Sequence, residues 1–154
     1  MRLKKLYSAR EVAALTGLSA RQLQWWHARK LFVPSVAPHK TSAGGFTERR
    51  YTPVDVLELL ALAELRRRGF TPAELKLMMD TLREYFRRRL SETLDDAGEM
   101  RLLTNGHGLF LRSRQGHIFD LLVDPTQPLI TGDGLSLKPV IGRAKTKRKT
   151  PKRA

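Results

Sequence analysis

The chain has 154 residues, 41% of them apolar, which is enough to bury one modest hydrophobic core. It contains no cysteine, so disulfide bonds and thiolate metal sites are excluded. No apolar run approaches the length of a membrane span, and residues 1–7 lack the apolar stretch of a secretory signal. We therefore expect a cytoplasmic protein with no membrane partner.

The formal net charge is +14, and it is distributed unevenly. Residues 1–90 hold 18 Lys and Arg against 8 Asp and Glu, residues 91–137 hold 3 against 7, and residues 138–154 hold 8 against none. A strongly basic surface favours binding to a polyanion such as nucleic acid. The acidic middle segment is not expected to share that partner.

Two short helices joined by a tight turn are predicted near the N-terminus. Ser8 with Glu11, and Ser19 with Gln22, fit the pattern in which two side chains three residues apart cap a helix reciprocally. Gly17 stands between the helices, where a left-handed backbone favours a residue without a Cβ. Apolar residues at helical spacing are predicted to pack the two helices together: Val12, Leu15, Leu18, Leu23 and Trp26. This combination predicts a helix-turn-helix and makes DNA the first partner to consider.

A loop and a third helix are predicted next. Residues 32–51 are rich in proline, glycine and polar side chains, which predicts a loop with a hairpin tip at Gly44–Gly45. Thr52 as a cap and Pro53 at the first helical position open the third helix, and Gly69 ends it. Its predicted apolar face consists of Leu57, Leu60, Ala61, Leu62 and Leu65.

The same start signal recurs at Thr71–Glu74 and predicts a fourth helix. Its apolar spacing predicts that it continues to about Asp96, where Gly98 stops it. The predicted apolar face consists of Leu75, Met78, Met79, Leu82, Phe86, Leu90 and Leu94. Part of this face follows a heptad spacing, which favours a short helical contact between two chains.

Beyond Gly98 the pattern predicts a small antiparallel sheet rather than a helix. Strands are predicted over residues 100–104, 109–113 and 117–123, with a short edge strand at Leu129–Thr131. The turns are predicted at Asn105–Gly106 and Gln115–Gly116. Such a sheet needs helices or a second chain to pack on. The basic tail over residues 138–154 is predicted to be disordered and to add salt-sensitive affinity for DNA.

The second helix carries the first group of candidate DNA contacts. Leu23 and Trp26 point to the core, so Ala20, Arg21, Gln24, Trp25 and Ala28 lie on the opposite face. An arginine in the first turn of such a helix suits bidentate contact with guanine, which makes Arg21 the leading candidate. Gln24 suits adenine or is an ordinary surface residue. Trp25 packs either on the sugar-phosphate backbone or in the core.

The basic and aromatic cluster Arg49–Tyr51 carries the second group, since such side chains suit phosphate contacts that set register. Tyr51 is open between phosphate contact and packing, and Lys40 is a weaker candidate. Arg66–Arg68 suit either phosphate contact or the negative end of the helix dipole. The predicted DNA-contacting set is Arg21, Gln22, Gln24, Trp25, Lys40, Arg49, Arg50 and Tyr51.

Other polar residues carry no predicted chemistry. His107, His117 and Asp120 lack convergent ligand spacing, and we assign them to turns rather than to a metal or catalytic site. His27 is interpreted as a surface or capping side chain. No nucleophile–base pair, phosphate loop or cofactor motif is present, so we expect no enzymatic activity and no cofactor.

The order of these signals resembles the MerR family of winged helix-turn-helix transcription regulators. The resemblance covers about residues 6–90 and rests on four stretches. The first two are the opening helices with their Trp25–Trp26 pair and a segment from Gly45 to Tyr51 that is similar to the family's wing. The other two are the start of the third helix at Thr52–Asp55 and the link LRRRGFTPAEL that follows this helix. The two-fold symmetry of a homodimer predicts a palindromic promoter site, and the resemblance implies that the bound dimer bends and untwists the promoter DNA. The resemblance also favours Arg49 as a DNA contact.

The chain departs from the family pattern at three places. Thr47–Glu48 are inserted in the wing, Gln24 stands where the family often has Arg, and Lys30 stands where it often has Gly. The last change predicts a less sharply turned helix end. The cysteines of metal-sensing and iron–sulfur members are absent, which excludes those sensing modes.

The expected fold is mainly α. Its predicted parts are a winged helix-turn-helix DNA-binding domain (1–79), a dimerisation helix (80–97), a small β segment (98–137) and the disordered basic tail (138–154). The leading functional interpretation is a homodimeric, sequence-specific transcription regulator in the cytoplasm, associated with the nucleoid. Alternatives are an architectural or recombination accessory DNA-binding protein, and a repressor controlled by a protein partner that binds residues 98–137.

Overall fold

The computed structural model describes residues 5–36, 39–40, 47–129 and 136–141. The predicted hairpin tip at Gly44–Gly45 and most of the predicted disordered tail lie outside them. The chain divides into two compact units, Met1–Ala63 and Glu64–Ala154, and the division falls inside the third helix. Within the described ranges, no helix is long and apolar enough to cross a membrane.

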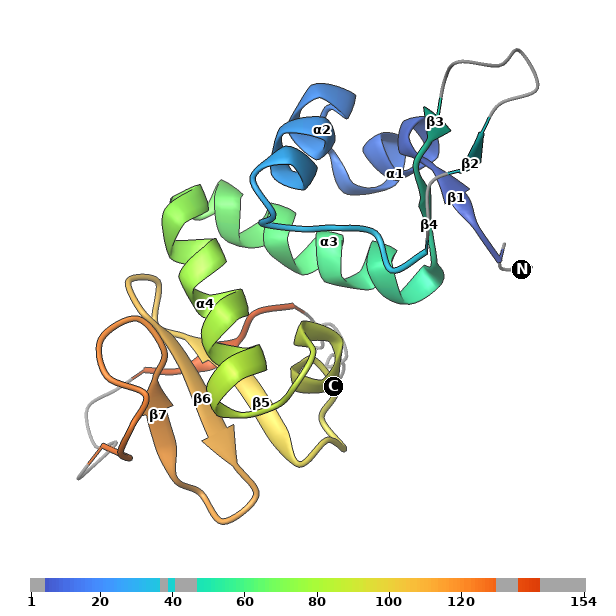
Figure 1. The fold of residues 1–154 in the computed structure, drawn as a ribbon. Helices are drawn as coiled ribbons and strands as arrows, with labels where there is room; N and C mark the ends of the chain where they lie inside the picture. Colours follow the sequence, from blue (N-terminus) through green and yellow to red (C-terminus); the bar gives the residue numbers. More distant parts are fainter. Residues whose placement is uncertain (1–4, 37–38, 41–46, 130–135, 142–154) are drawn as a thin grey trace, which may run out of the picture. The chain divides into compact units, whose positions relative to one another are not determined.

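The first unit contains the two predicted N-terminal helices, short paired strands and most of the third helix (Figure 1). In chain order its elements are β1 (Tyr7–Ser8), α1 (Ala9–Thr16), α2 (Ala20–Ala28), β2 (His39–Lys40), β3 (Thr47–Glu48), β4 (Arg50–Tyr51) and α3 (Pro53–Arg67). Strand β1 pairs with β4 so that Tyr7 faces Tyr51, and β2 pairs with β3 so that His39 faces Glu48; both pairs are antiparallel.

The predicted caps of α1 and α2 are confirmed. The Ser8 hydroxyl accepts from the Glu11 amide at 3.1 Å, while the Glu11 carboxylate accepts from the Ser8 amide at 2.9 Å. Ser19 and Gln22 repeat this exchange at 3.0 and 2.9 Å. Gly17 has φ 83° and donates to the Ala13 carbonyl, so it closes α1 in the left-handed conformation.

Four of the five residues predicted to pack α1 on α2 are buried, namely Val12, Leu18, Leu23 and Trp26. Leu15 is 53% exposed, so its predicted place in the core is wrong. Thr16 is buried instead, one turn after Val12, and its hydroxyl donates to the Val12 carbonyl and accepts from the Leu18 amide. The buried stripe therefore runs through positions 12 and 16, which turns Leu15 towards solvent.

The start of α3 confirms its predicted cap. The Thr52 hydroxyl accepts from the Asp55 amide at 3.1 Å, and the Asp55 carboxylate accepts from the Thr52 amide at 3.0 Å. The apolar face lies about one position away from the prediction at its N-terminal end. Leu57 is 38% exposed, whereas Val56 and Leu59 are buried. Gly69, with φ 104°, follows the helix as expected.

The second unit contains α4 (Pro72–Tyr85), capped by Thr71 and Glu74 as predicted. The prediction that this helix continues to Asp96 is wrong. Arg87 has φ 56°, and the Arg88 amide donates back to the Leu82 carbonyl, which ends the helix. A 3₁₀ turn, η1 (Leu90–Thr93), follows and buries Leu90. Leu90 is thus buried as its apolar spacing suggests, but in a 3₁₀ turn and not in a continued α-helix.

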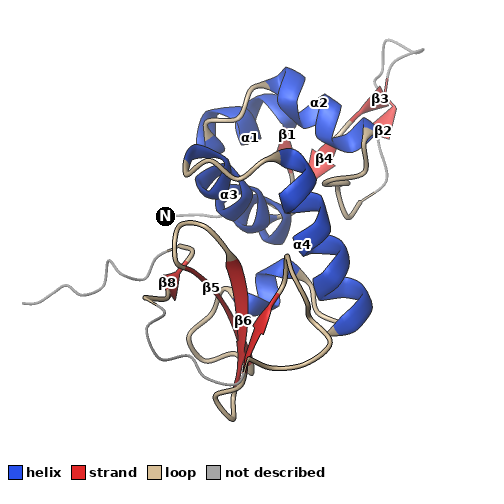
Figure 2. Cartoon of the chain, turned by 90° about the vertical axis from the view of Figure 1, so that its left-hand side faces the viewer, coloured by secondary structure: helices blue, strands red, loops and turns tan. Residues whose placement is uncertain are grey.

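A four-stranded antiparallel sheet completes this unit, in the order β7-β6-β5-β8. Figure 1 labels β7, β6 and β5, and Figure 2 labels β6, β5 and β8. Its strands are β5 (Met100–Thr104), β6 (Leu109–Ser113), β7 (Ile118–Asp120) and β8 (Lys138–Pro139). The first two match their predicted bounds, and the third is shorter than predicted. The turn glycines Gly106 and Gly116 both have φ 94°. Phe86, after α4, packs edge-on against Phe119 of β7 with ring centroids 5.2 Å apart.

Strand β8 corrects the predicted start of the disordered tail at residue 138. Lys138 pairs with Thr104 and Pro139 with Leu103, and Val140 is 1% exposed. Burial of Val140 gives this basic segment an apolar anchor that composition alone did not reveal. Of the predicted edge strand at Leu129–Thr131, the Leu129 amide donates to the Ile118 carbonyl at 2.8 Å, and the other two residues lie outside the described ranges.

Candidate nucleic-acid interface

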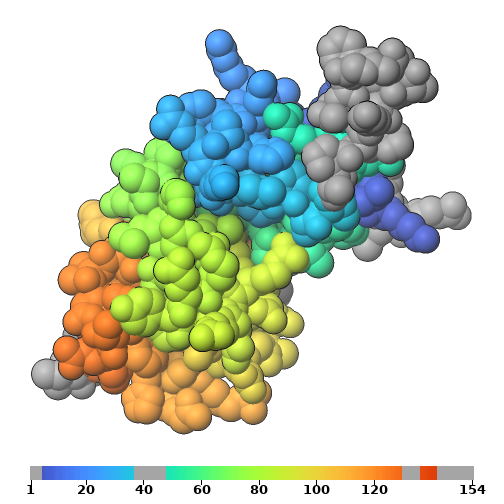
Figure 3. All heavy atoms as spheres, viewed as in Figure 1, coloured from blue at the N-terminus to red at the C-terminus, as the bar shows by residue number. Residues whose placement is uncertain are grey.

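The exposed face of α2 is the centre of the candidate interface. Leu23 and Trp26 are each 2% exposed and fix the helix on the first unit. The residues predicted to lie opposite them are all exposed: Ala20, Arg21, Gln24, Trp25 and Ala28. Figure 3 shows the blue atoms of this N-terminal region at the surface of the molecule. The buried anchors thus decide which side chains α2 offers to a ligand.

Arg21 and Gln24 lie one turn apart on this face, and both are exposed. Gln22 is exposed too, but its side-chain oxygen accepts from the Ser19 amide at 2.9 Å. Its amide oxygen therefore serves the helix N-terminus, which leaves Arg21 and Gln24 better suited to read a base edge.

Trp25 is 43% exposed, so it is not a second core aromatic. The Arg29 guanidinium lies over its ring, 4.6 Å from the centroid, in a cation–π contact. This contact holds a positive charge and an aromatic surface together at the C-terminal end of α2. The exposure excludes the core role for Trp25, and its packing on the sugar-phosphate backbone stays a prediction.

The end of α2 is turned sharply despite the lysine there. Lys30 has φ 59°, the Lys30 amide donates to His27, and the Leu31 amide donates to Trp26 at 2.9 Å. These bonds are those of a helix that ends in a left-handed residue, a position that favours glycine. The expectation that Lys30 makes this end less sharp is therefore wrong.

Arg49, in the link between β3 and β4, is bonded to α2. Its Nε donates to Nδ1 of His27 at 2.9 Å, and His27 is half-buried. Burial lowers the pKa of His27, and the positive charge of Arg49 lowers it further. Because its Nδ1 accepts the bond from Arg49, this nitrogen carries no proton, and His27 acts as a neutral acceptor. Sequence reasoning missed this role, because no spacing pattern connects residues 22 positions apart.

The remaining members of the second cluster differ in exposure. Arg50 is half-exposed and lies 3.7 Å from the Glu48 carboxylate. Tyr51 is 1% exposed, and burial raises the pKa of its hydroxyl. Of its two open roles the structure shows packing, and we no longer include Tyr51 among the DNA contacts. Lys40 lies in β2, and its side chain is outside the described part of the structure.

A buried carboxylate ties the segment after α2 to the start of α3. Asp55 is fully buried and accepts from the Ser35 amide at 3.1 Å and the Ser35 hydroxyl at 2.9 Å, in addition to the Thr52 amide. These bonds fix where the chain leaves the helix-turn-helix. They therefore support α2 without belonging to its exposed face.

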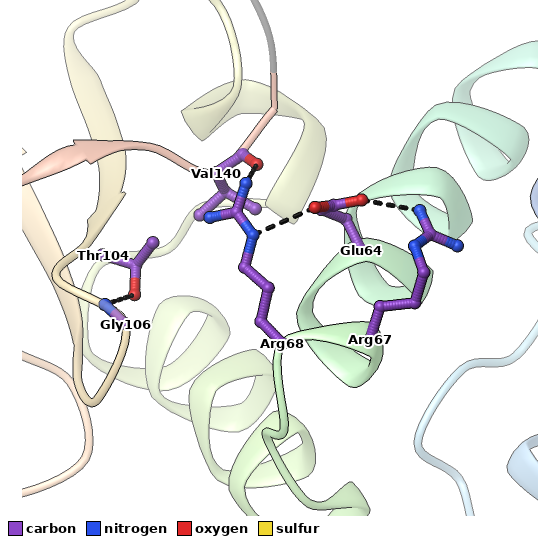
Figure 4. A network of polar contacts seen from close by, with 6 residues as sticks. All are labelled: Glu64, Arg67, Arg68, Thr104, Gly106 and Val140. Carbon is purple, nitrogen blue, oxygen red and sulfur yellow. Dashed lines mark hydrogen bonds and ion pairs between the residues drawn. The ribbon is translucent and has the colours of Figure 1, made fainter.

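The arginines at the end of α3 make local contacts (Figure 4). Arg67 and Arg68 bond to the Glu64 carboxylate at 2.6 and 3.0 Å, and Arg68 also donates to the Val140 carbonyl at 3.3 Å. Arg66 donates to the Phe70 carbonyl at 2.8 Å. The bonds to Glu64 and to the carbonyls of Phe70 and Val140 favour a structural role for these arginines over phosphate contact.

The histidines of the second unit lie in the connections between strands, and the predicted turn at His107 is confirmed. The His107 amide donates to the Asn105 side chain, and the His117 amide donates to the Ser113 hydroxyl. Asp120 accepts from the Leu122 and Val123 amides. The described ranges contain no group of three or more His, Asp or Glu arranged to hold a metal ion.

Comparison with known proteins finds a similar family for the N-terminal half of the chain. The model of the MerR HTH family regulatory protein matches residues 7–82. This stretch, just under half of the chain, is therefore similar to the MerR HTH family. The chain is also similar to the HTH-type transcriptional regulator TnrA of Bacillus subtilis (strain 168), with 38% identity over 72 residues.

The matches with individual proteins cover only part of each chain. The match with TnrA covers 47% of this chain and 59% of the relative, so the chain spans about three-fifths of the relative's length. A crystal structure of a MerR-family transcriptional regulator from Bacillus cereus is 24% identical, covers 46% of this chain and 48% of that one, and has a TM-score of 0.38.

Proposed function

We propose that this chain is a sequence-specific DNA-binding transcription regulator that acts as a homodimer on a palindromic promoter site. One observation carries the proposal: within a MerR-type domain, the buried Leu23 and Trp26 leave Arg21, Gln24 and Trp25 exposed together on α2. An exposed helix face with an arginine in its first turn suits the major groove. We expect no enzymatic activity.

In this proposal α2 enters the major groove, and the β2–β4 segment forms the wing along the flanking backbone. Arg21 contacts guanine, Gln24 contacts an adjacent base, and Trp25 packs on the sugar-phosphate backbone. Arg49 and Arg50 contact phosphates, and Lys40 is a further candidate. The bond between Arg49 and His27 supports this arrangement, because it links the wing to the helix that reads the bases.

A second copy of the chain completes the proposed site. Leu77 and Tyr85 on α4 are 45% and 57% exposed, which gives this helix an apolar surface for a partner. Because α4 ends at Tyr85, the helical contact is shorter than residues 80–97 suggested. Two-fold symmetry then predicts a palindromic operator whose half-sites lie about one helical turn, or a multiple of it, apart. Bending and untwisting of the promoter DNA is part of this proposal.

Selection of bound sequences from a random DNA pool tests the proposal, with the stoichiometry of the complex measured at the same time. The expected result is a palindromic consensus bound by two chains. Arg21→Ala is expected to lose about 1–3 kcal/mol of binding free energy and to relax preference at one base pair. Arg114→Ala is the matched control, because it removes one exposed positive charge from a turn of the second unit. An unchanged consensus with Arg21→Ala contradicts the assigned face.

Two alternatives remain to be separated by experiment. The basic tail motivates an architectural or recombination accessory protein, and broad genomic occupancy in place of a few promoter peaks favours that alternative. The acidic charge of residues 91–137 motivates a repressor controlled by a protein partner. The absence of a stoichiometric partner in a pull-down with the full chain contradicts it.

A further inference from the structure

We infer that His27 is a positioning residue for DNA binding: its neutral imidazole holds the Arg49 guanidinium by Nε, so that Nη1 and Nη2 face a DNA phosphate. This inference rests on the proposed function and assigns His27 a role in it. It is carried by the 2.9 Å bond from Arg49 Nε to His27 Nδ1.

The bond determines which atoms of Arg49 are available. An imidazole nitrogen that accepts a hydrogen bond carries no proton, so the imidazole proton of His27 is on Nε2. Because Nε is the inner donor of the guanidinium, its use on the protein side leaves the two terminal amino groups for a ligand. Two parallel N–H groups match two oxygens of a phosphate. The bond therefore orients Arg49 without using the donors that bind an anion.

The chemical nature of the partner is as informative as its position. Arg50, the neighbour of Arg49, lies beside the Glu48 carboxylate, which offsets part of its charge. His27 is neutral, so it fixes Arg49 and leaves its full positive charge for a polyanion. A carboxylate in place of His27 would hold the guanidinium equally well but would compete with phosphate for it. This difference separates a positioning role from an ordinary structural ion pair.

The half-burial of His27 supports the same assignment. Its position in the last turn of α2 partly shields the imidazole from water, and burial and the Arg49 charge both lower its pKa. Orientation before binding reduces the conformational freedom that a long arginine side chain loses when it meets DNA. The expected consequence is a phosphate contact that depends on His27 although His27 does not touch the phosphate.

The test measures how binding of the full chain to a mixed-sequence DNA duplex of about 30 base pairs depends on salt concentration. Each lost phosphate contact lowers the magnitude of the slope of log binding constant against log salt by about 1. Arg49→Gln is expected to lower the slope by about 1, with about a tenfold loss of affinity at low salt. His27→Leu is expected to reproduce most of this change, and the double variant to add little to Arg49→Gln.

His27→Asn is the rescue variant, because its side-chain oxygen lies near the place of Nδ1 and accepts the same bond. It is expected to restore the wild-type slope, which recovery of packing alone would not do. A thermal unfolding curve for each variant, followed by tryptophan fluorescence, confirms that the first unit is folded.

Each outcome bears on one hypothesis. If the wild type shows no salt-dependent binding to the duplex, the proposed function fails. If the wild type binds and Arg49→Gln lowers the slope, but folded His27→Leu keeps it, the positioning role fails while the proposed function stands. If Arg49→Gln keeps the wild-type slope, Arg49 contacts no phosphate and the positioning role is overturned as well.

Discussion

Replacement of Asp55 by alanine is expected to destabilise the helix-turn-helix by about 3 kcal/mol. The carboxylate is fully buried and accepts from two backbone amides, of Ser35 and Thr52, and from the Ser35 hydroxyl. A hydrogen bond to a charged group contributes about 1.5–3 kcal/mol. The exposed Ser35 hydroxyl can bond to water in the variant, so the two amides account for most of the loss. Because the Ser35 amide can be partly hydrated in the variant, each of the two amide bonds is taken at the lower end of that range, which gives about 3 kcal/mol in total.

Urea unfolding followed by tryptophan fluorescence measures this loss in the correct unit, because both tryptophans of the chain, Trp25 and Trp26, lie in α2. Asp55→Asn keeps one acceptor oxygen and is expected to lose about half as much. Asp124→Ala is the control, since that carboxylate bonds to the nearby Thr126 in the second unit. A loss below about 1 kcal/mol for Asp55→Ala would refute the reasoning, because it would mean that water replaces the carboxylate at both amides.

Three further predictions concern the same unit. Leu23→Ala is expected to cost about 3 kcal/mol in the same unfolding assay, whereas Leu15→Ala, at an exposed position, is expected to change stability by less than about 0.5 kcal/mol; equal losses would contradict the observed packing. Lys30→Gly is expected to stabilise the first unit by about 0.5–1 kcal/mol. A left-handed residue with a Cβ costs about 1–2 kcal/mol, and the greater conformational freedom of glycine in the unfolded chain offsets part of the gain. A lower urea midpoint for the variant would contradict this prediction. The lowered pKa of His27 means that the folded state resists its protonation, so its contribution to stability is fully present above pH 6.5 and falls as the pH drops below that value. Melting temperatures at pH 7.5 and 5.5 are therefore expected to differ more for the wild type than for His27→Asn, and an equal difference would argue against a neutral His27.

The elements that the sequence predicts well are those determined by neighbouring residues. The capping pairs of α1, α2 and α4 join positions three residues apart. The residue types at these two positions are therefore enough to predict the hydrogen bonds between them. The turns at Gly106 and Gly116 depend on a left-handed backbone at one residue, which a glycine signals directly. For the same reason the bounds of β5 and β6 agree with the prediction.

The elements that the sequence does not predict depend on contacts between distant residues. The helical pattern continues through Leu90, yet α4 ends at Tyr85, because a 3₁₀ turn buries Leu90 equally well. Strand β8 pairs with β5 and is followed by the buried Val140, although residues 138–154 hold eight basic residues and no acidic one. The spacing of apolar residues indicates which side chains are buried. The tertiary structure determines whether an α-helix, a 3₁₀ turn or a strand buries them.

The candidate site divides in the same way. The exposed face of α2 follows from helical spacing, since Leu23 and Trp26 are recognisable as anchors. The bond from Arg49 to His27 joins residues 22 positions apart and has no local signature. Identification of Arg49 as a cation was therefore possible from the sequence, but identification of the group that orients it was not.

The structure also indicates which of the many positive charges a polyanion can use. Arg67, Arg83 and Arg88 of the second unit each lie within 3 Å of a carboxylate oxygen, so their charges are offset within the protein. In the first unit, by contrast, Arg29 stacks on an aromatic ring and Arg49 bonds to a neutral imidazole. Neutral partners fix a guanidinium in place without reducing the field that attracts phosphate. Arg29 and Arg49 lie on or beside the helix proposed to enter the groove, and their aromatic and imidazole partners leave both charges available to a polyanion.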